Sequence, residues 1–200
     1  MQKMRKGDYV TMNKESIRNN YINNVVPKWM TEGKVSNIMA MPAITKIIVN
    51  TGIGDIKENK DMIEQLVEQM GKITGQKPVV TKARQSIAAF NVREGMPVGV
   101  RVTLRGERMY HFLEKLFSYT LPRTRDFQGI SPNGFDGHGN YSFGLTEQLP
   151  FLEIDPNNVR RSFGLQVTIV TSTNDDTIAR ELLTELGAPF STSKEEGEKE

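Results

Sequence analysis

Residues 78–104 read PVVTKARQSIAAFNVREGMPVGVRVTL, and this stretch indicates how the chain folds. The apolar, β-branched runs at its two ends, residues 78–81 and 98–104, are typical of strands. The segment 82–97 between them is far longer than a usual hairpin loop of about two to five residues, and long loops in compact domains are usually functional. We therefore expect two strands joined by a long arm.

The arm at residues 82–97 combines side chains that suit RNA, which is read by shape, stacking and the 2′-hydroxyl. It offers cations for phosphates, polar groups for sugar or base edges and one ring for stacking: Lys82, Arg84, Arg93, Gln85, Ser86, Asn91 and Phe90. Because the arm has few apolar residues to bury, we expect it to be mobile until RNA orders it. Phe90 is placed toward its base, and residues 85–95 include its tip. A disordered surface excursion is the alternative, and the composition favours the RNA-binding arm.

The charge of the chain is unevenly distributed, although its net value is only +2. Residues 72–108 carry eight basic and two acidic side chains, whereas residues 175–200 carry three basic and eight acidic ones. The basic segment is therefore a candidate surface for a polyanion. A solvated lysine-rich face would have the same composition, so charge alone leaves both interpretations open.

Outward from the arm, hydrophobic periodicity predicts further strands at residues 44–50 and 165–171 and helices at 59–73, 106–120 and 175–187. Another helix is expected from residue 17 to 30, with Pro27 kinking it, and Pro122 should end the third helix. Residues 123–157 are rich in turn residues and should form short hairpins.

These elements predict an α+β fold, with a single antiparallel-rich β-sheet and helices packed on one face. The other face, together with the basic arm, would be free for RNA. We expect one domain at residues 15–190, preceded by a basic N-terminal extension at 1–14 and followed by an acidic disordered tail at 191–200.

Enzymatic and metal-binding functions find no support in the residues. The chain has no cysteine, which excludes disulfide frameworks, cysteine zinc sites and thiol nucleophiles. His111 and His138 lack partners at metal-ligand spacing, and no carboxylate pair or nucleophile elbow occurs. We expect no catalytic residue, metal or cofactor. No apolar run approaches the roughly 18–20 residues of a membrane span, so no membrane partner and an intracellular location are expected.

Gly52 and Gly54 follow a strand and precede a helix, as in the opening turn of a dinucleotide-binding unit. Lys57 stands where the third glycine of that motif belongs. A tight turn explains the two glycines better, and a nucleotide-dependent enzyme that uses them is kept as an alternative of a different class.

Several blocks of the chain resemble one protein family, in order and with few gaps from about residue 17 to 190. They are KIIVNTGIGD, ITGQKPVVTKARQSIAAFNVREGMPVGVRVTLRGERMYHFLEKL, PRTRDFQGIS, FDGHGNYSFGLTEQLPFLEI, GLQVTIVT and ELLTELGAPF. The spacing of GQKP, TKAR, RGERM and FLEKL is highly specific. On these blocks the chain resembles the bacterial large-subunit ribosomal protein L-five family.

The resemblance implies an α+β protein of the cytoplasmic ribosome whose sheet surface and loops bind 5S ribosomal RNA (5S rRNA) in the central protuberance. Further implied partners are large-subunit rRNA, P-site tRNA at the arm, a protein of the small-subunit head and other 5S-binding ribosomal proteins. The family's 5S-contacting positions correspond to Lys46, Asn50, Gln76, Phe90 and Thr103.

Two further groups of residues complete the expected RNA site. Phosphate contacts are expected from Lys77, Lys82, Arg84, Arg101 and Arg105. The tRNA-proximal part of the arm comprises Gln85, Ser86, Asn91, Arg93 and Gly95.

The chain departs from the family pattern in three places. Ala89 stands where the family usually has glycine, which stiffens the arm, and Asn91 replaces a usual lysine, which removes a phosphate contact. About a dozen extra residues precede Met12; a start at Met12 would give a family-like length, and the sequence leaves Met1 and Met12 both open. A free-standing RNA chaperone or regulator of the same fold is the remaining alternative.

Overall fold

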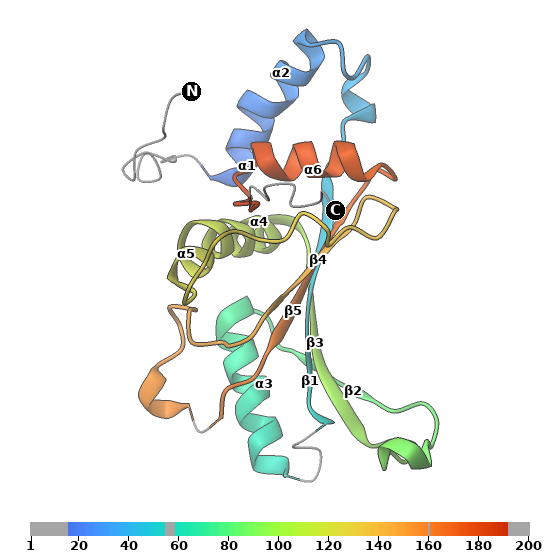
Figure 1. Ribbon diagram of the computed structural model, residues 1–200, viewed down its shortest axis with the longest axis vertical. Helices are drawn as coiled ribbons and strands as arrows, with labels where there is room; N and C mark the ends of the chain where they lie inside the picture. Colours follow the sequence, from blue (N-terminus) through green and yellow to red (C-terminus); the bar gives the residue numbers. More distant parts are fainter. Residues whose placement is uncertain (1–15, 55–58, 160, 192–200) are drawn as a thin grey trace, which may run out of the picture.

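In the computed structural model, residues 16–54, 59–159 and 161–191 are described (Figure 1), and they contain one antiparallel sheet with the strand order β2-β3-β1-β5-β4. The strands are β1 (Ile44–Gly52), β2 (Val79–Lys82), β3 (Pro97–Leu104), β4 (Tyr141–Leu145) and β5 (Leu165–Thr171). The four predicted strands are confirmed, and β4 lies in the region expected to hold short hairpins. The predicted extension at 1–14 and all but the first residue of the predicted tail lie outside the described residues.

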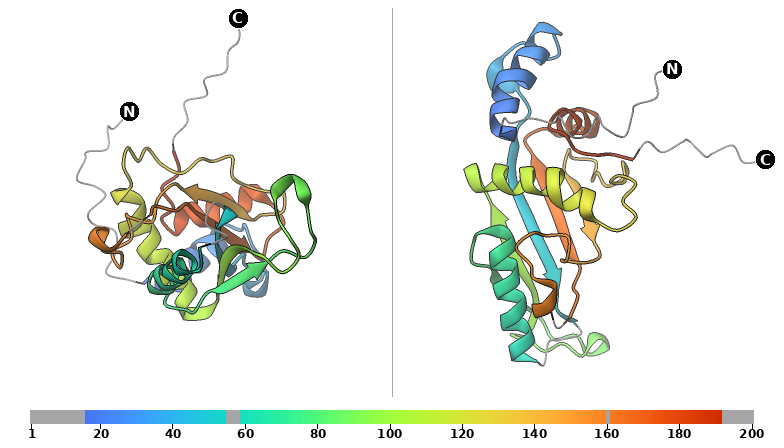
Figure 2. Two further views of the ribbon diagram at one scale, coloured as in Figure 1. Left: turned by 90° about the horizontal axis from the view of Figure 1, so that it is seen from below. Right: turned by 90° about the vertical axis from the view of Figure 1, so that its left-hand side faces the viewer.

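Helices cover one face of this sheet and one of its ends. They are α1 (Ile17–Asn20), η1 (Tyr21–Val25), α2 (Val26–Thr31), α3 (Lys60–Thr74), α4 (Gly106–Lys115), η5 (Leu116–Thr120), α5 (Leu121–Arg123) and α6 (Asp176–Glu185). Short 3-10 turns are η2 (Ile38–Ala40), η4 (Ala88–Phe90) and η6 (Pro156–Asn158). Helices α3 and α4 pack on the face of the sheet, whereas α6 and the α1–α2 pair stand over one end of it (Figures 1 and 2). The predicted α+β class is confirmed, but only part of the helical layer lies on the face.

The core lies between the sheet and helices α3 and α4. Strand side chains that point toward the helices alternate with side chains that point away, as the period of a strand requires. The inward set is buried: Ile47, Val49, Val100, Val102, Leu104, Val167 and Ile169. Opposite it lie the apolar stripes of the two helices: Leu66, Met70, Ile73, Met109, Phe112 and Leu113.

Helix α3 begins and ends where the sequence predicts. The Asn59 side chain accepts a hydrogen bond from the Met62 backbone N–H, and Gly75 ends the helix in the left-handed region at φ 66°. The fourth predicted helix is confirmed as α6, capped by Asp175. Within α6 the apolar side chain of Ile178 is 38% exposed, whereas Ala179 lies on the buried stripe.

Two prolines lie inside helical segments and directly follow π-helical turns. Pro27 lies in the first turn of α2 after η1, and Pro122 lies in the first turn of α5 after η5. Proline has no N–H to donate and its ring clashes with the carbonyl four residues earlier, and a wider turn relieves both problems. The prediction that Pro122 ends its helix is therefore wrong, because the chain continues helically to Arg123.

Tyr141 fixes the start of β4 in an aromatic cluster. Its side chain is completely buried, its hydroxyl donates a hydrogen bond of 2.7 Å to the Ser131 carbonyl, and its ring centroid lies 4.8 Å from that of Phe135. Burial raises the pKa of Tyr141 to about 12. The neutral phenol is thus favoured in the folded protein.

The contribution of Tyr141 to stability should therefore be present below about pH 10 and be lost as the pH rises toward about 12. Tyr141→Phe should lower the free energy of unfolding at neutral pH by about 1 kcal/mol, because the hydrogen bond to Ser131 is lost. It should also flatten the alkaline decrease. Urea unfolding at a series of pH values measures both effects, with exposed Tyr119→Phe as the control. An alkaline decrease identical in Tyr141→Phe and the parent would contradict this assignment.

Candidate nucleic-acid interface

The sheet face turned away from α3 and α4, here called the open face, gathers polar side chains by cross-strand register. In one row Asn50 pairs with Arg101 of β3 on one side and with Gln166 of β5 on the other. The next row places Thr103, Ile48, Thr168 and Ser142 side by side, and Lys46 pairs with Val170 in the row beyond. Three predicted RNA contacts, Lys46, Asn50 and Thr103, therefore share one surface.

The row around Asn50 has the chemistry needed to bind an RNA backbone and read an adjacent group. Cβ atoms of directly paired residues lie about 4.5–5.5 Å apart, so the Arg101 guanidinium, the Asn50 amide and the Gln166 amide can contact neighbouring groups of one ligand. Arg101 supplies the cation that a phosphate requires, and the two amides supply donors and acceptors for sugar or base edges.

At the end of the open face nearest the arm, Gly52 leaves the backbone of β1 exposed, whereas the glycine beside it on β3, Gly99, is buried. Gly52 of β1 pairs with Gly99 of β3, which pairs with Thr81 of β2. A Cβ at Gly99 would lie 3.0 Å from both the Thr51 carbonyl oxygen and Thr81 Oγ1, so the packing requires glycine there. A ligand backbone can approach this part of the sheet closely.

Gln76 joins the open face through the edge of β3. Its Nε2 donates a hydrogen bond of 3.2 Å to the Thr103 carbonyl, at a point that β2 does not reach because β2 begins at Val79. The side chain thus completes the hydrogen bonding of β3 and lies beside Thr103. Gln76 has a structural role in addition to the RNA contact predicted for it.

Lys46 and the cations between residues 77 and 108 differ in their partners from many of those elsewhere. Arg18, Lys28, Lys34, Lys72 and Lys115 each form an ion pair with a glutamate. Within the described part of the chain, no carboxylate lies within ion-pair distance of Lys46, Lys77, Lys82, Arg84, Arg93, Arg101, Arg105 or Arg108. Seven of the eight basic side chains in residues 72–108, all except Lys72, therefore have no ion-pair partner among the described residues.

The arm is an extension of the β2–β3 hairpin. The Ala83 N–H donates to the Met96 carbonyl at 2.8 Å, the Gly95 N–H donates to the Ala83 carbonyl at 3.0 Å, and Ile87 forms a bridge with Val92. The chain reverses through η4, after which Asn91 adopts a left-handed φ of 50°. Asparagine tolerates this conformation better than most residues, which gives a physical reason for Asn91 at a family lysine position.

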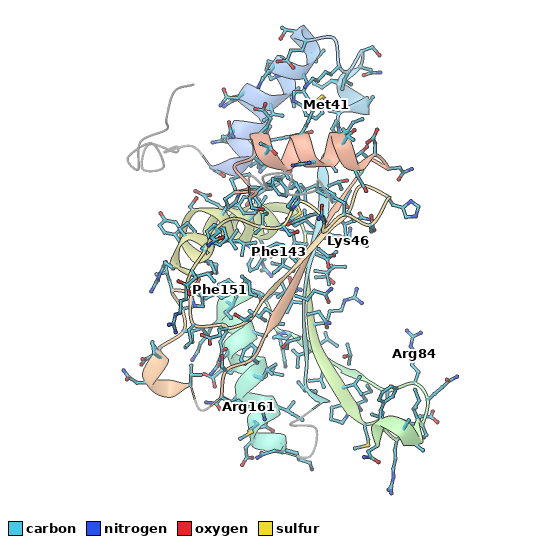
Figure 3. The ribbon with its side chains drawn as sticks, in the orientation of Figure 1. Met41, Lys46, Arg84, Phe143, Phe151 and Arg161 are labelled. Atoms are coloured by element: carbon cyan, nitrogen blue, oxygen red, sulfur yellow. The ribbon has the colours of Figure 1, made fainter. Side chains whose placement is uncertain are left out.

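The tip of the arm projects away from the body of the molecule (Figure 1). Phe90 is 71% exposed and lies at this tip, so the expectation that it sits toward the base is wrong. It does not lie with Lys46, Asn50 and Thr103, although the family resemblance assigns all four to one RNA. The other predicted arm residues surround it and are exposed: Arg84, Gln85, Ser86, Arg93 and Gly95. Figure 3 shows the Arg84 side chain on the arm, and Ser86 Oγ accepts a hydrogen bond of 2.9 Å from the Glu94 N–H.

The sequence analysis missed the β4 and β5 side of the open face. Gln166 and Thr168 alternate with the buried residues of LQVTIVT, a signal that could have placed both of them on one surface. Ser142 Oγ lies 2.9 Å from Thr168 Oγ1 and extends the polar row to the edge strand. In β4 the alternation of Tyr141, Phe143 and Leu145 with Ser142 and Gly144 is a similar but shorter signal.

Metal-binding and membrane-spanning features find no support in the described residues. No group of three or more His, Asp or Glu side chains there could hold a metal ion, and His111 and His138 are exposed. No helix in the same ranges has the length and apolar character needed to cross a membrane. Lys57, which the dinucleotide-turn comparison uses, lies outside the described residues.

Comparison with known proteins gives matches over almost the whole described chain. A family model described as "Ribosomal protein L5" matches residues 37–93, and a model of the C-terminus of the same ribosomal protein family matches residues 97–190. The large ribosomal subunit protein uL5 of Macrococcus caseolyticus is 52% identical over 174 residues, which cover 87% of this chain and 97% of that protein. The uL5 protein of Thermotoga maritima is 51% identical over 87% of this chain and 95% of its own length. For Natranaerobius thermophilus uL5 the identity is 53%, over 86% and 96% of the two chains.

Proposed function

The chain belongs to the ribosomal protein L5 family, and we propose that it binds 5S rRNA with its open face and reaches P-site tRNA with its arm. As a member of this family it is a structural constituent of the large ribosomal subunit in the cytoplasm and not an enzyme. Its general partner is therefore ribosomal RNA. The alternative of a nucleotide-dependent enzyme is overturned by the family.

The observation that carries the 5S proposal is the coincidence of unneutralised cations and polar side chains on one uncovered sheet face. Arg101 and Lys46 would neutralise phosphates and supply most of the affinity. Asn50 and Thr103 would read a defined RNA shape, with Gln76 holding the strand edge beside them. A sheet anchored from behind by α3 and α4 presents these groups with little ordering cost on binding.

The arm supports a second RNA contact, because its exposed tip carries Arg84, Arg93 and Phe90 well away from the open face. The contacts with a small-subunit head protein and with other 5S-binding proteins rest on the family resemblance. A free-standing RNA chaperone would require a pool of the protein outside ribosomes. Sedimentation of a lysate separates these functions, and we expect stoichiometric migration with large subunits.

Salt dependence tests whether the cations bind RNA. The logarithm of the 5S rRNA affinity should fall linearly with the logarithm of salt concentration, because each neutralised phosphate releases counterions. Arg101→Ala and Lys82→Ala should each reduce the slope by about one. Filter binding of the full chain between low and moderate salt measures the slope.

Lys34→Ala is the matched control, since Lys34 is an exposed lysine whose Nζ lies 2.8 Å from Glu181 Oε2 at the opposite end of the molecule. This variant should keep the parental slope. An affinity that does not depend on salt, or an equal change in slope for Lys34→Ala and Arg101→Ala, would show that the basic surface is only solvated.

A further inference from the structure

A cavity of about 360 Å³ lies on the helix side of the sheet, between the end of β1, helix α3 and the segment that leads into β5. Its wall includes Gly54, Gln65, Gln69, Arg161 and Phe163. Figure 3 shows Arg161 beside α3. The volume falls in the range of small-molecule sites, which are mostly apolar with a few placed polar groups. Gly52 belongs both to the wall of this cavity and to the end of the open face, whereas the arm does not contribute to the cavity.

Gln69 is the first sign that the cavity takes a polar ligand. The residue is 92% buried, since 8% of its surface is exposed, and its Oε1 accepts a long hydrogen bond of 3.4 Å from Gln148 Nε2. Its own Nε2 donates to no residue in the described ranges. Among the described residues Trp29 Nε1 is the one fully buried side-chain polar atom without a partner, so Gln69 Nε2 is accessible to solvent. A ligand acceptor in the cavity would be able to accept its hydrogen bond.

The wall opposite α3 is held in place by a second glutamine. Gln148 is fully buried, its Oε1 accepts from the Phe163 N–H at 2.9 Å and from Ser162 Oγ at 3.2 Å, and its Nε2 donates to the Arg161 carbonyl at 3.0 Å. These three bonds fix the backbone that carries the guanidinium of Arg161 and the ring of Phe163. The cavity is therefore formed before any ligand enters.

Gly54 supplies an independent observation on the third wall. Its φ lies outside the left-handed region, and no atom of residues 16–54, 59–159 or 161–191 lies within 4 Å of the position that a Cβ would take. Neither the backbone conformation nor the packing thus requires glycine at this position. Close approach of a ligand to the backbone is a common reason for glycine where those two are absent.

We propose that this cavity binds a single nucleotide. The ring of Phe163 and the apolar side chains of Ile53 and Leu66 line it and suit the faces of a base. The amides of Gln69 and Gln65 meet polar atoms on the base edge, and the Arg161 guanidinium meets the phosphate. The same chemistry recognises an unstacked nucleotide of ribosomal RNA and a free mononucleotide. The site accounts for Gly54 without any catalytic group.

The first arm of the test uses the full-length chain and the four free ribonucleoside monophosphates in an NMR titration. At least one of them should shift resonances of the cavity residues. Gln69→Leu removes the unpartnered donor, and Gly54→Val narrows the cavity without touching a hydrogen bond. Each should weaken binding about fivefold to tenfold, the effect of one lost polar contact. Glu64→Gln, an exposed change on α3 outside the cavity, should leave binding within about twofold of the parent.

The second arm probes rRNA bases chemically in large subunits that carry the same variants. If the occupant is an rRNA nucleotide, Gln69→Leu and Gly54→Val should make one base more reactive, and Glu64→Gln should not. Mononucleotide binding alone identifies a free nucleotide, and a reactivity change alone identifies rRNA. Neither effect, or equal effects in the control, overturns the proposal. Asn50→Ala should leave mononucleotide binding by the isolated chain unchanged, which separates this site from the open face.

Discussion

Replacing Asn50, Gln76 and Thr103 together by alanine is expected to abolish most of the specific affinity for 5S rRNA. Each single replacement should weaken binding by roughly 1–3 kcal/mol, the scale of a lost buried hydrogen bond. Asn50 lies on the central strand of the open face, between Arg101 and Gln166. Filter binding with 5S rRNA at fixed salt measures the effect.

The three effects should not be additive, because Gln76 and Thr103 lie in contact. Gln76 Nε2 bonds to the backbone of Thr103, so Gln76→Ala removes the bond that holds the strand edge and thereby also disturbs the position of Thr103. A double-mutant cycle of these two positions should therefore show coupling, whereas Asn50 should combine independently with either. Far-UV circular dichroism should stay parental for all variants.

Asn24→Ala is the matched control for Asn50→Ala. Asn24 is an exposed asparagine in η1, over the end of the sheet, and its Nδ2 donates to Asn20 Oδ1. Its replacement should leave 5S binding unchanged. If Asn50, Gln76 and Thr103 variants also bind like the parent, the open face is not the 5S site.

Strand periodicity explains why part of this site could be predicted from the sequence. Residues at even positions of β1, such as Lys46 and Asn50, must share one face once Ile47 and Val49 are buried. The same argument holds for Arg101 and Thr103 on β3. What the sequence could not supply is the strand order. The pairing of β1 with β5 joins residues that lie more than a hundred positions apart in the sequence. Local sequence patterns cannot predict such a pairing.

Two expectations drawn from local sequence patterns were wrong, because the structural feature that decides each of them has no sequence signal. Pro122 is typical of a helix end, but the π-helical turn η5 before it accommodates the ring. Phe90 was expected at the base of the arm, because the residues around it do not indicate which positions of the arm pair with one another. Because Ile87 pairs with Val92, residues 88–91 form the turn of the arm, and Phe90 therefore lies at its tip.

The last prediction concerns the arm. Replacing residues 85–95 by a short Gly-Ser turn between Arg84 and Met96 should leave the domain folded. Every residue from 84 to 95 is exposed except Val92, which is partly buried, so the core loses no fully buried side chain. The pairing of Thr81 with Gly99 and the Ala83–Met96 hydrogen bond remain to close the shortened hairpin. Thermal unfolding by circular dichroism should therefore stay close to that of the parent.

The two RNA contacts should respond differently to this replacement. Binding to 5S rRNA should persist, because Asn50 and Thr103 are untouched and Phe90, which is removed, lies at the tip and away from the open face. Reconstituted ribosomes that carry the shortened protein should release P-site tRNA roughly tenfold faster, as expected for a lost contact worth about 1.4 kcal/mol. Phe90→Ala in an arm of full length tests how much of the tRNA contact comes from stacking on the Phe90 ring. The rate of tRNA release should increase less in this variant than in the shortened protein if the backbone and the cations of the tip also contribute. Complete loss of 5S binding, or an unchanged rate of tRNA release, would show that the arm does not make the tRNA contact assigned to it.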